Sequence, residues 1–174
     1  MFRVLVVDDE SSLRGILSEL LGDAGYYVET AESGEAALER IKNSAFHVVI
    51  TDIRLGGMNG IELIRLIRGM GVETEVIVMT SHASFSTAVE ALRLGAYDYL
   101  MKPFEDLDAV LALVKRTIDK IRLVLENRRL VETLKRKNEE LEQLAVRDGL
   151  TGLYNYRYLQ ESLQTEVNRS ERHG

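Results

Sequence analysis

The stretch FHVVITDIRLGGMNG, residues 46–60, determines how the rest of the chain is interpreted. It begins with an apolar, β-branched run, passes through an aspartate at position 52 and ends in a loop with three glycines. A continuous apolar run of this length, bounded by turn residues, is typical of a strand buried in a parallel sheet. The stretch therefore predicts an α/β protein with Asp52 at the carboxyl end of a buried strand.

Further segments of this kind recur along the first hundred residues, and helical patterns separate them. The expected strands are residues 2–7, 26–30, 46–52, 75–81 and 96–102. The first two expected helices follow Ser11 and Ser33 as N-caps, and two more cover residues 61–67 and 85–94. Five strand–helix units at this spacing predict a doubly wound five-stranded parallel sheet with helices on both faces.

The chain changes character after Pro103, its only proline. Residues from about 107 to 146 contain neither glycine nor proline, which predicts a helix about 60 Å long at ~1.5 Å per residue. Its first half carries an apolar stripe that can pack on the sheet. Its second half carries a heptad seam of Val124, Asn127, Val131, Leu134, Asn138, Leu141 and Ala145. We expect a two-chain coiled coil whose asparagines weaken pairing but fix its register; the alternative is a helix folded back on the sheet.

Composition narrows the possible functions. The chain has 174 residues, which suits one domain or one domain with an appendage, and it has no cysteine for disulfide or thiolate chemistry. The net charge of −6 falls entirely in residues 1–104, which argues against nucleic acid as the direct ligand of that part. No apolar run approaches the ~18 residues needed to span a membrane, and the N-terminus lacks the pattern of a signal peptide. We expect a cytoplasmic protein without membrane contact.

Polar side chains gather at the carboxyl ends of the expected strands. Asp8 and Asp9 follow the first strand, Asp52 ends the third, Thr80 lies at the end of the fourth and Lys102 ends the fifth. These ends meet at one edge of a doubly wound sheet, where such folds place their site. Clustered carboxylates need a cation, and Mg²⁺ suits oxygen ligands of this kind. An ammonium and a hydroxyl suit a phosphoryl group carried by a nucleophilic aspartate. Each residue alone has an ordinary structural explanation, but their joint placement is specific.

Four motifs, VVDDE, VVITDIRLGGMNG, VIVMTSHAS and GAYDYLMKPF, resemble those of response-regulator receiver domains in order and spacing. This resemblance implies a flavodoxin-like fold in which Asp52 accepts phosphate from a sensor histidine kinase. It further implies that Asp9, Asp52 and the backbone carbonyl of Arg54 bind Mg²⁺, with Asp8 assisting through water.

The same resemblance assigns the switch residues. Lys102 would contact the phosphate, Thr80 would reorient towards it, and Tyr99 would follow by rotating inwards. The Lys102–Pro103 bond would be cis. One departure is visible, because Gly56 stands where the family often has proline in the loop after the acceptor. We expect that loop to be more flexible, although no liganding residue is lost.

A second resemblance concerns DGLTGLYNYRYL, residues 148–159, which is similar to the opening motif of diguanylate cyclase (GGDEF) domains, Asp-x-Leu-Thr-x-Leu-x-Asn-Arg-Arg. The matching residues are Asp148, Leu150, Thr151, Leu153, Asn155 and Arg157. Tyr156 replaces the first arginine of the motif. The signature loop and the nucleotide-binding residues of that family are absent, so we expect no enzyme activity from this chain. A longer form would make cyclic di-GMP.

These observations predict a receiver domain over residues 1–120, a coiled-coil signalling helix over 121–147 and the truncated start of a GGDEF-type domain over 148–174. The leading hypothesis is a phosphorylation-dependent input module that signals to a cyclase through a homodimeric helix. The alternative is a free-standing receiver that acts by docking to another protein. A hydrolase of the same fold is disfavoured, because position 54 is arginine and offers no acid–base group beside Asp52.

Overall fold

The computed structural model describes residues 1–81, 85–104, 106–147, 151 and 153–173, and of these it describes no side chain for 85, 86, 143–145, 157, 161, 165, 166 and 170–173. The chain divides into two compact units, Met1–Arg122 and Leu123–Gly174. Each unit is described by itself below.

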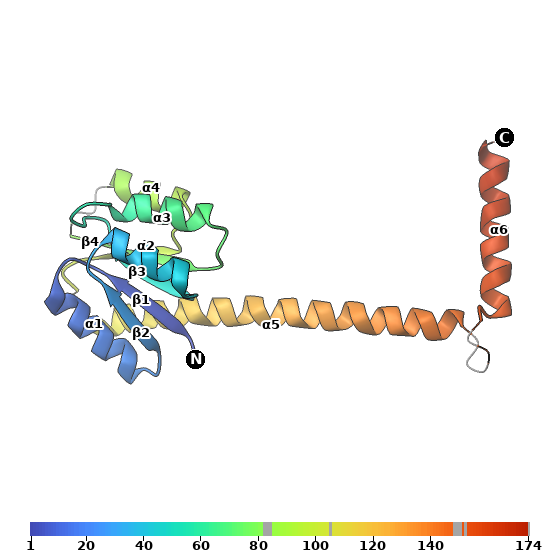
Figure 1. The fold of residues 1–174 in the computed structure, drawn as a ribbon, viewed down its shortest axis with the longest axis horizontal. Coiled ribbons are helices and arrows are strands. Elements are labelled where there is room, and N and C mark those ends of the chain that lie inside the picture. Colours follow the sequence, from blue (N-terminus) through green and yellow to red (C-terminus); the bar gives the residue numbers. More distant parts are fainter. Residues whose placement is uncertain (82–84, 105, 148–150, 152, 174) are drawn as a thin grey trace. The chain divides into compact units, whose positions relative to one another are not determined.

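The first unit is built on a five-stranded sheet. Its strands are β1 (Arg3–Val7), β2 (Tyr27–Ala31), β3 (Val48–Asp52), β4 (Glu75–Thr80) and β5 (Asp98–Met101). All neighbouring pairs are parallel and the order is β2-β1-β3-β4-β5 (Figure 1). The predicted doubly wound parallel sheet is confirmed, with each strand shorter or shifted by one or two residues. This order places β1 beside β3, so the acidic ends of these two strands become neighbours.

Helices cover both faces of the sheet. They are α1 (Ser11–Asp23), α2 (Gly34–Asn43), α3 (Gly60–Gly69), α4 (Phe85–Arg93) and the first part of α5 (Leu107–Val146). Successive side chains of β1 point to opposite faces, so Leu5 belongs to the core beneath α2 and α3, whereas Val4 belongs to the core beneath α1 and α5. The expected apolar stripe of α5 is buried in that second core at Val110, Val114 and Ile118.

The helix starts agree only in part with the sequence prediction. Ser33 caps α2 as expected, since its hydroxyl oxygen accepts a hydrogen bond from the N–H of Ala36 at 3.2 Å. The cap of α1 was wrong: Glu10 is the N-cap and Ser11 is already helical. The physical reason lies in the preceding turn, where the Asp8 carboxylate accepts the N–H of Glu10 at 2.9 Å and so fixes Glu10 in an extended conformation.

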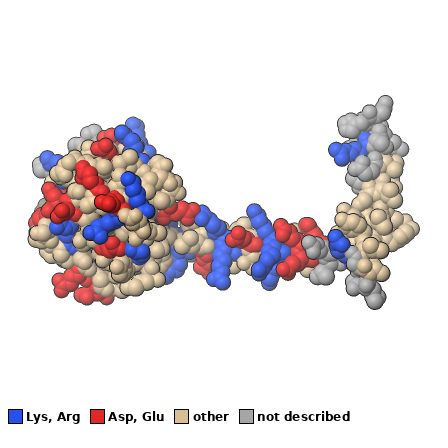
Figure 2. Space-filling view, viewed as in Figure 1, with Lys and Arg blue, Asp and Glu red and all other residues tan. Residues whose placement is uncertain are grey.

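In the second unit, α5 continues to Val146 and is followed by α6 (Tyr156–His173). The predicted 40-residue helix is therefore observed as one element. Arg147 pairs with Tyr154 in a short antiparallel bridge, and the Asn155 side chain caps α6 by accepting the N–H of Tyr158 at 2.9 Å. Figure 2 shows acidic and basic side chains interleaved along the second part of α5, as expected for a solvated helix.

The heptad seam lies in this second part of α5. Its described apolar residues Val124, Val131, Leu134 and Leu141 have exposed fractions of 48, 45, 65 and 63%. The side chain of Ala145, which was assigned to the same seam, lies outside the described residues. Exposed apolar side chains at heptad spacing are the surface that a partner helix would cover.

Candidate functional site

Three aspartates meet at the carboxyl edge of the sheet. Asp8 follows β1, Asp9 comes next, and Asp52 is the last residue of β3. One carboxylate oxygen from each lies within 4.8 Å of the other two. Strand register explains the meeting, because Val7 pairs with Thr51 and the residues that follow them, Asp8 and Asp52, therefore lie at the same level of the sheet. Asp8 is fully buried and Asp52 is 6% exposed, whereas Asp9 faces solvent.

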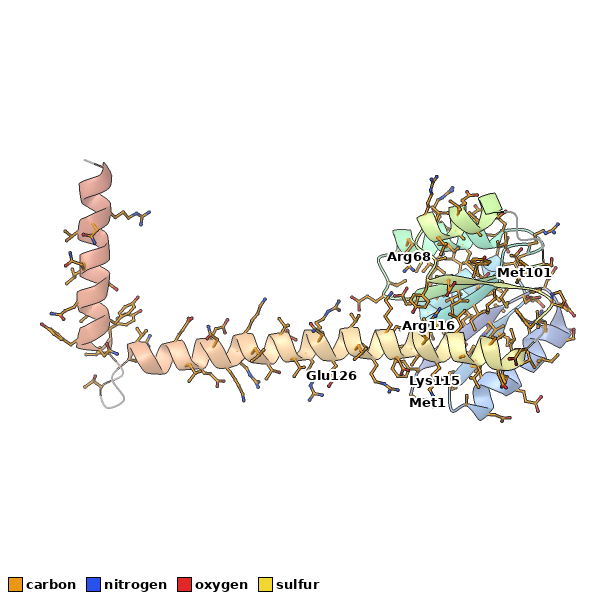
Figure 3. All side chains as sticks on the ribbon, turned by 180° about the vertical axis from the view of Figure 1, so that it is seen from behind. Met1, Arg68, Met101, Lys115, Arg116 and Glu126 are labelled. Carbon is orange, nitrogen blue, oxygen red and sulfur yellow. The ribbon has the colours of Figure 1, made fainter. Side chains whose placement is uncertain are left out.

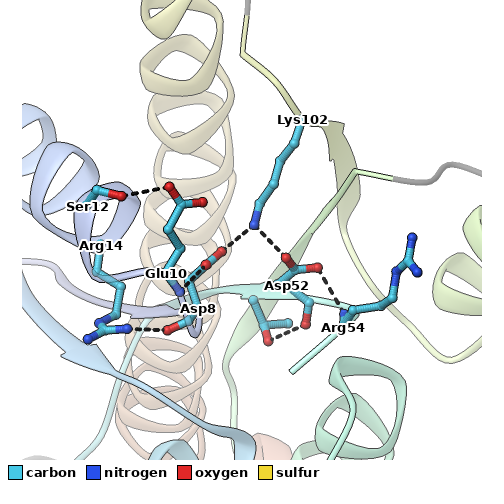
Figure 4. A network of polar contacts seen from close by, with 8 residues as sticks. Asp8, Glu10, Ser12, Arg14, Asp52, Arg54 and Lys102 are labelled. Carbon is cyan, nitrogen blue, oxygen red and sulfur yellow. Dashed lines mark hydrogen bonds and ion pairs between the residues drawn. The ribbon is translucent and has the colours of Figure 1, made fainter. Parts of the chain in front are cut away.

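Lys102 supplies a positive charge to this cluster. Its ammonium lies 2.5 Å from Oδ2 of Asp8 and 2.5 Å from Oδ2 of Asp52 (Figure 4). The lysine reaches the site because it follows β5 directly, and its backbone N–H donates to the carbonyl of Thr80 at 2.8 Å. Burial alone lowers the pKa of Lys102, but its hydrogen bonds to Asp52 and Asp8 outweigh burial and raise that pKa. The ammonium is therefore charged at neutral pH.

The two loops that carry the acids are held by local hydrogen bonds. The N–H of Arg54 donates to Oδ1 of Asp52 at 2.9 Å, which fixes the acceptor carboxylate from the loop side. Arg14 donates from Nη1 to the backbone carbonyl of Asp8 at 2.7 Å (Figure 4). This role of Arg14 was not predicted from the sequence, because an arginine in the first turns of a helix looks like a surface charge. No sequence signal distinguishes it.

The two predicted switch residues occupy different environments. Thr80 is 3% exposed at the end of β4, opposite Met101 of β5 in the strand register. The ring of Tyr99 on β5 is 40% exposed. Residues 82–84 of the motif VIVMTSHAS lie outside the described residues. The Lys102–Pro103 bond is cis, as the resemblance implied. The inward rotation of Tyr99 stays a prediction.

The donor set at this edge fits a hard divalent cation. All three groups are carboxylates, and Mg²⁺ prefers oxygen ligands from one or two carboxylates completed by water and phosphate oxygens. Asp9 is the most accessible of the three, which leaves room for such partners. The residues present therefore match the predicted Mg²⁺ site.

A doubly wound parallel sheet whose carboxyl edge gathers three aspartates and a bridging lysine defines a receiver-type signalling domain. Residues 4–115 match the response regulator receiver domain family, and the chain belongs to that family. Members of the family are phosphorylated on an aspartate by sensor histidine kinases. The chain therefore contains the phosphorylatable receiver domain of a two-component response regulator.

Curated relatives agree with this assignment. The chain is 43% identical over 115 residues to the DNA-binding transcriptional regulator NtrC of Escherichia coli K12, which covers 66% of this chain and 24% of the relative. It is 44% identical over 110 residues to the transcriptional regulatory protein ZraR of the same strain, covering 62% of this chain and 25% of the relative. The chain thus matches about a quarter of the length of these relatives.

Solved structures give the same fold. The chemotaxis protein CheY4 of Vibrio cholerae has a TM-score of 0.64 at 34% identity, covering 67% of this chain and 98% of that one. The BeF3-activated DrrB receiver domain has a TM-score of 0.63 at 34% identity, with coverages of 68% and 98%. Among the residues that the structure describes, no helix combines the length and apolar character that crossing a membrane requires.

Proposed function

We propose that this chain is a phosphorylation-switched input module in which Asp52 is the acceptor. A carboxylate oxygen of Asp52 attacks the phosphorus of a phosphohistidine on the sensor kinase. A P–O bond forms, the P–N bond breaks, and the imidazole leaves with the bonding electron pair and takes up a proton. The observation that carries the proposal is that Lys102 bridges the carboxylates of Asp8 and Asp52 while the Arg54 N–H donates to Asp52.

The neighbouring groups have distinct tasks in this reaction. Lys102 now bridges two carboxylates, and it is placed to turn towards the negative oxygens of a phosphoryl group on Asp52. Asp9, Asp52 and the Arg54 carbonyl would hold Mg²⁺, with Asp8 assisting through water. When bound, that ion neutralises the charge of the acids and of the transferred group. The hydroxyl of Thr80 would donate a hydrogen bond to the phosphoryl group, and the ring of Tyr99 would then rotate inwards.

For the output, we propose a homodimer through α5 that controls a diguanylate cyclase. Two features support this: the exposed seam of Val124, Val131, Leu134 and Leu141, and the motif that begins at residue 148. Asp148 and Leu150 of that motif lie outside the described residues, as does the side chain of Arg157. With no nucleotide-binding residues after residue 148, this chain itself should neither bind GTP nor form cyclic di-GMP.

A second candidate output is DNA binding, which the name of the relative NtrC favours. The match to NtrC spans 115 residues, and the receiver match at residues 4–115 is of similar length. The receiver can therefore account for the similarity, and the motif after α5 favours the cyclase. A free-standing receiver that acts by docking remains the alternative to any relay through the helix, and a monomeric chain in both phosphorylation states would favour it.

The acceptor is tested by intact-mass measurement after incubation with acetyl phosphate and Mg²⁺. The chain should gain one phosphoryl group, and Asp52→Asn should gain none. Asp23→Asn, at the exposed end of α1, is the matched control and should be labelled like the unaltered chain. Equal labelling of the Asp52→Asn chain would remove Asp52 as the acceptor.

A further inference from the structure

The loop between β3 and α3, residues 53–59, is tied near its C-terminal end to the start of α2. Oε1 of Glu35 accepts a hydrogen bond from the N–H of Met58 at 2.8 Å. The neighbouring Gly57 has a φ of +103°, a conformation that L side chains rarely adopt. A Cβ at Gly57 would lie 2.7 Å from the same oxygen of Glu35. The carboxylate thus occupies space that only a glycine leaves open.

The start of α2 also packs closely against Met58 through Gly34. A Cβ added to Gly34 would lie 2.9 Å from the carbonyl oxygen of Met58 and 3.0 Å from its Cβ. The side chain of Met58 packs, partly buried, against the core beneath α2 and α3. The consecutive pair Gly34 and Glu35 therefore fits closely against the consecutive pair Gly57 and Met58. This close packing restrains the position of the loop in addition to the hydrogen bond from Met58 to Glu35.

Both ends of the same loop are held close to the acceptor Asp52. At the near end, the N–H of Arg54 donates to the Asp52 carboxylate at 2.9 Å. At the far end, Gly60 donates to the carbonyl of Ile53 at 2.9 Å, and a Cβ at Gly60 would overlap the carbonyl oxygen of Asp52. Between these two ends, Glu35 of α2 adds a further anchor at Met58.

We propose that Glu35 is a positioning residue for the phosphoacceptor loop. By holding Met58, it keeps the backbone carbonyl of Arg54 in position to bind the divalent cation beside Asp52. The proposal rests on the proposed function of that site. Glycine at position 56 leaves the loop without the proline that often stiffens it in this family, and the Glu35 contact supplies a restraint instead. Without it, the loop must be ordered when the cation binds, and that loss of conformational entropy weakens binding.

A purely local role for Glu35 makes different predictions. An acid in the first turn of a helix also interacts favourably with the helix dipole. The N–H of Glu35 itself and the N–H of Met58 both hold the pKa of this carboxyl below its usual range, so the group is charged at neutral pH. Two variants separate the roles. Glu35→Gln keeps an oxygen that can accept from Met58 but loses the charge, whereas Glu35→Asp keeps the charge but is one methylene too short to reach.

The test measures Mg²⁺ binding to the full chain by calorimetry and the initial rate of labelling by acetyl phosphate. Glu35→Ala and Glu35→Asp should raise the Kd for Mg²⁺ by about tenfold, the lower end of the range for groups that support metal ligands. Labelling should be slow at low Mg²⁺ and approach the unaltered rate at saturating Mg²⁺. Glu35→Gln should resemble the unaltered chain. The control Glu39→Ala, one turn further along α2 and exposed, should change neither quantity.

An unchanged Kd in both Glu35→Ala and Glu35→Asp, with circular dichroism showing a folded chain, would overturn the proposal. So would equal loss in Glu35→Gln and Glu35→Ala with full retention in Glu35→Asp, because that pattern follows the charge alone. If Glu35→Ala does not fold, the comparison of Gln with Asp still decides. A chain that binds Mg²⁺ but is never labelled would defeat the proposed function of Asp52 and leave the calorimetric test of Glu35 intact.

Discussion

The ammonium of Lys102 lies 2.5 Å from the carboxylate of Asp52, although fifty residues separate the two in the sequence. The same ammonium contacts Asp8, which is fully buried. Lys102 therefore stabilises two acids that would otherwise repel each other in a region of low dielectric constant. Under the proposed mechanism, a phosphoryl group on Asp52 would offer this lysine a more highly charged partner.

Replacing Lys102 by methionine tests this compensation. The variant leaves Asp8 and Asp52 buried without their cation, and removing one partner of a buried pair typically costs about 3–5 kcal/mol. Urea unfolding should show a loss of this order, and Mg²⁺ should restore part of it because metal binding does not need the lysine. Lys115→Met, on an exposed part of α5 (Figure 3), is the control and should leave stability nearly unchanged. Equal stability of the two variants would contradict the bridge.

The metal site is tested through thermal unfolding. A ligand that binds only the folded chain stabilises it by about 1.4 kcal/mol at ten times its Kd. Mg²⁺ should therefore raise the melting temperature, and Asp9→Asn should remove most of that rise, because Asp9 is the accessible member of the acid cluster. Asp23→Asn should keep the full effect. A melting temperature that does not change with millimolar Mg²⁺ would show that the acids do not form this site.

The environment of His47 predicts that the stability of the folded chain depends on pH. Its Nδ1 accepts the N–H of Arg3 at 3.1 Å. Burial lowers the pKa of His47, and the N-terminal amino group and the Arg3 side chain add to this effect. In the unfolded chain a histidine has a pKa of about 6.5. The folded chain binds this proton less well, so its stability should fall as the pH drops below about 6.5 towards the folded pKa.

His47→Asn provides the comparison, since its amide oxygen can accept from Arg3 but does not titrate. The free energy of unfolding should be measured in urea at several pH values between 7.5 and 5.5. The chain with His47 should lose stability relative to His47→Asn as the pH falls, because only the histidine takes up a proton. Parallel profiles would assign the acid sensitivity to other groups.

The seam of α5 predicts a change in self-association. Asn138 occupies a core heptad position, and its amide donates to Glu142 at 3.0 Å within the same helix. Asn138→Leu should tighten the dimer in sedimentation experiments, because an apolar residue replaces a polar one at the interface. Arg136→Leu, on the opposite side of the helix, should not. Spin labels at Leu134 and Leu141 should change spacing on phosphorylation, and Asn138→Leu should blunt that change. Chains that stay monomeric at high concentration would exclude the relay.

The central strands β1, β3 and β4 could be predicted from the sequence, because they are buried and therefore consist mainly of apolar residues. The edge strands β2 and β5 are only partly buried, and their positions followed from the alternation of strands and helices. The acids and Lys102 could be predicted as neighbours for a related reason, since parallel strands end at one edge whatever the path between them. Arg14 and Glu35 escaped prediction because their partners are backbone atoms of Asp8 and Met58. Backbone acceptors and donors are present at every position, so no residue type marks the place where a side chain will meet them.

The contact between Lys102 and Asp8 joins positions ninety-four residues apart, from the residue after the first strand to the residue after the last. During synthesis, a ribosome releases the acids of β1 and β3 well before this lysine emerges. A nascent chain is therefore expected to remain unable to accept a phosphoryl group until β5 has joined the sheet. Phosphorylation would thus require the completed fold, and unfinished chains would not compete with mature ones for the kinase. Phosphorylation of stalled chains that end before residue 102 would contradict this expectation.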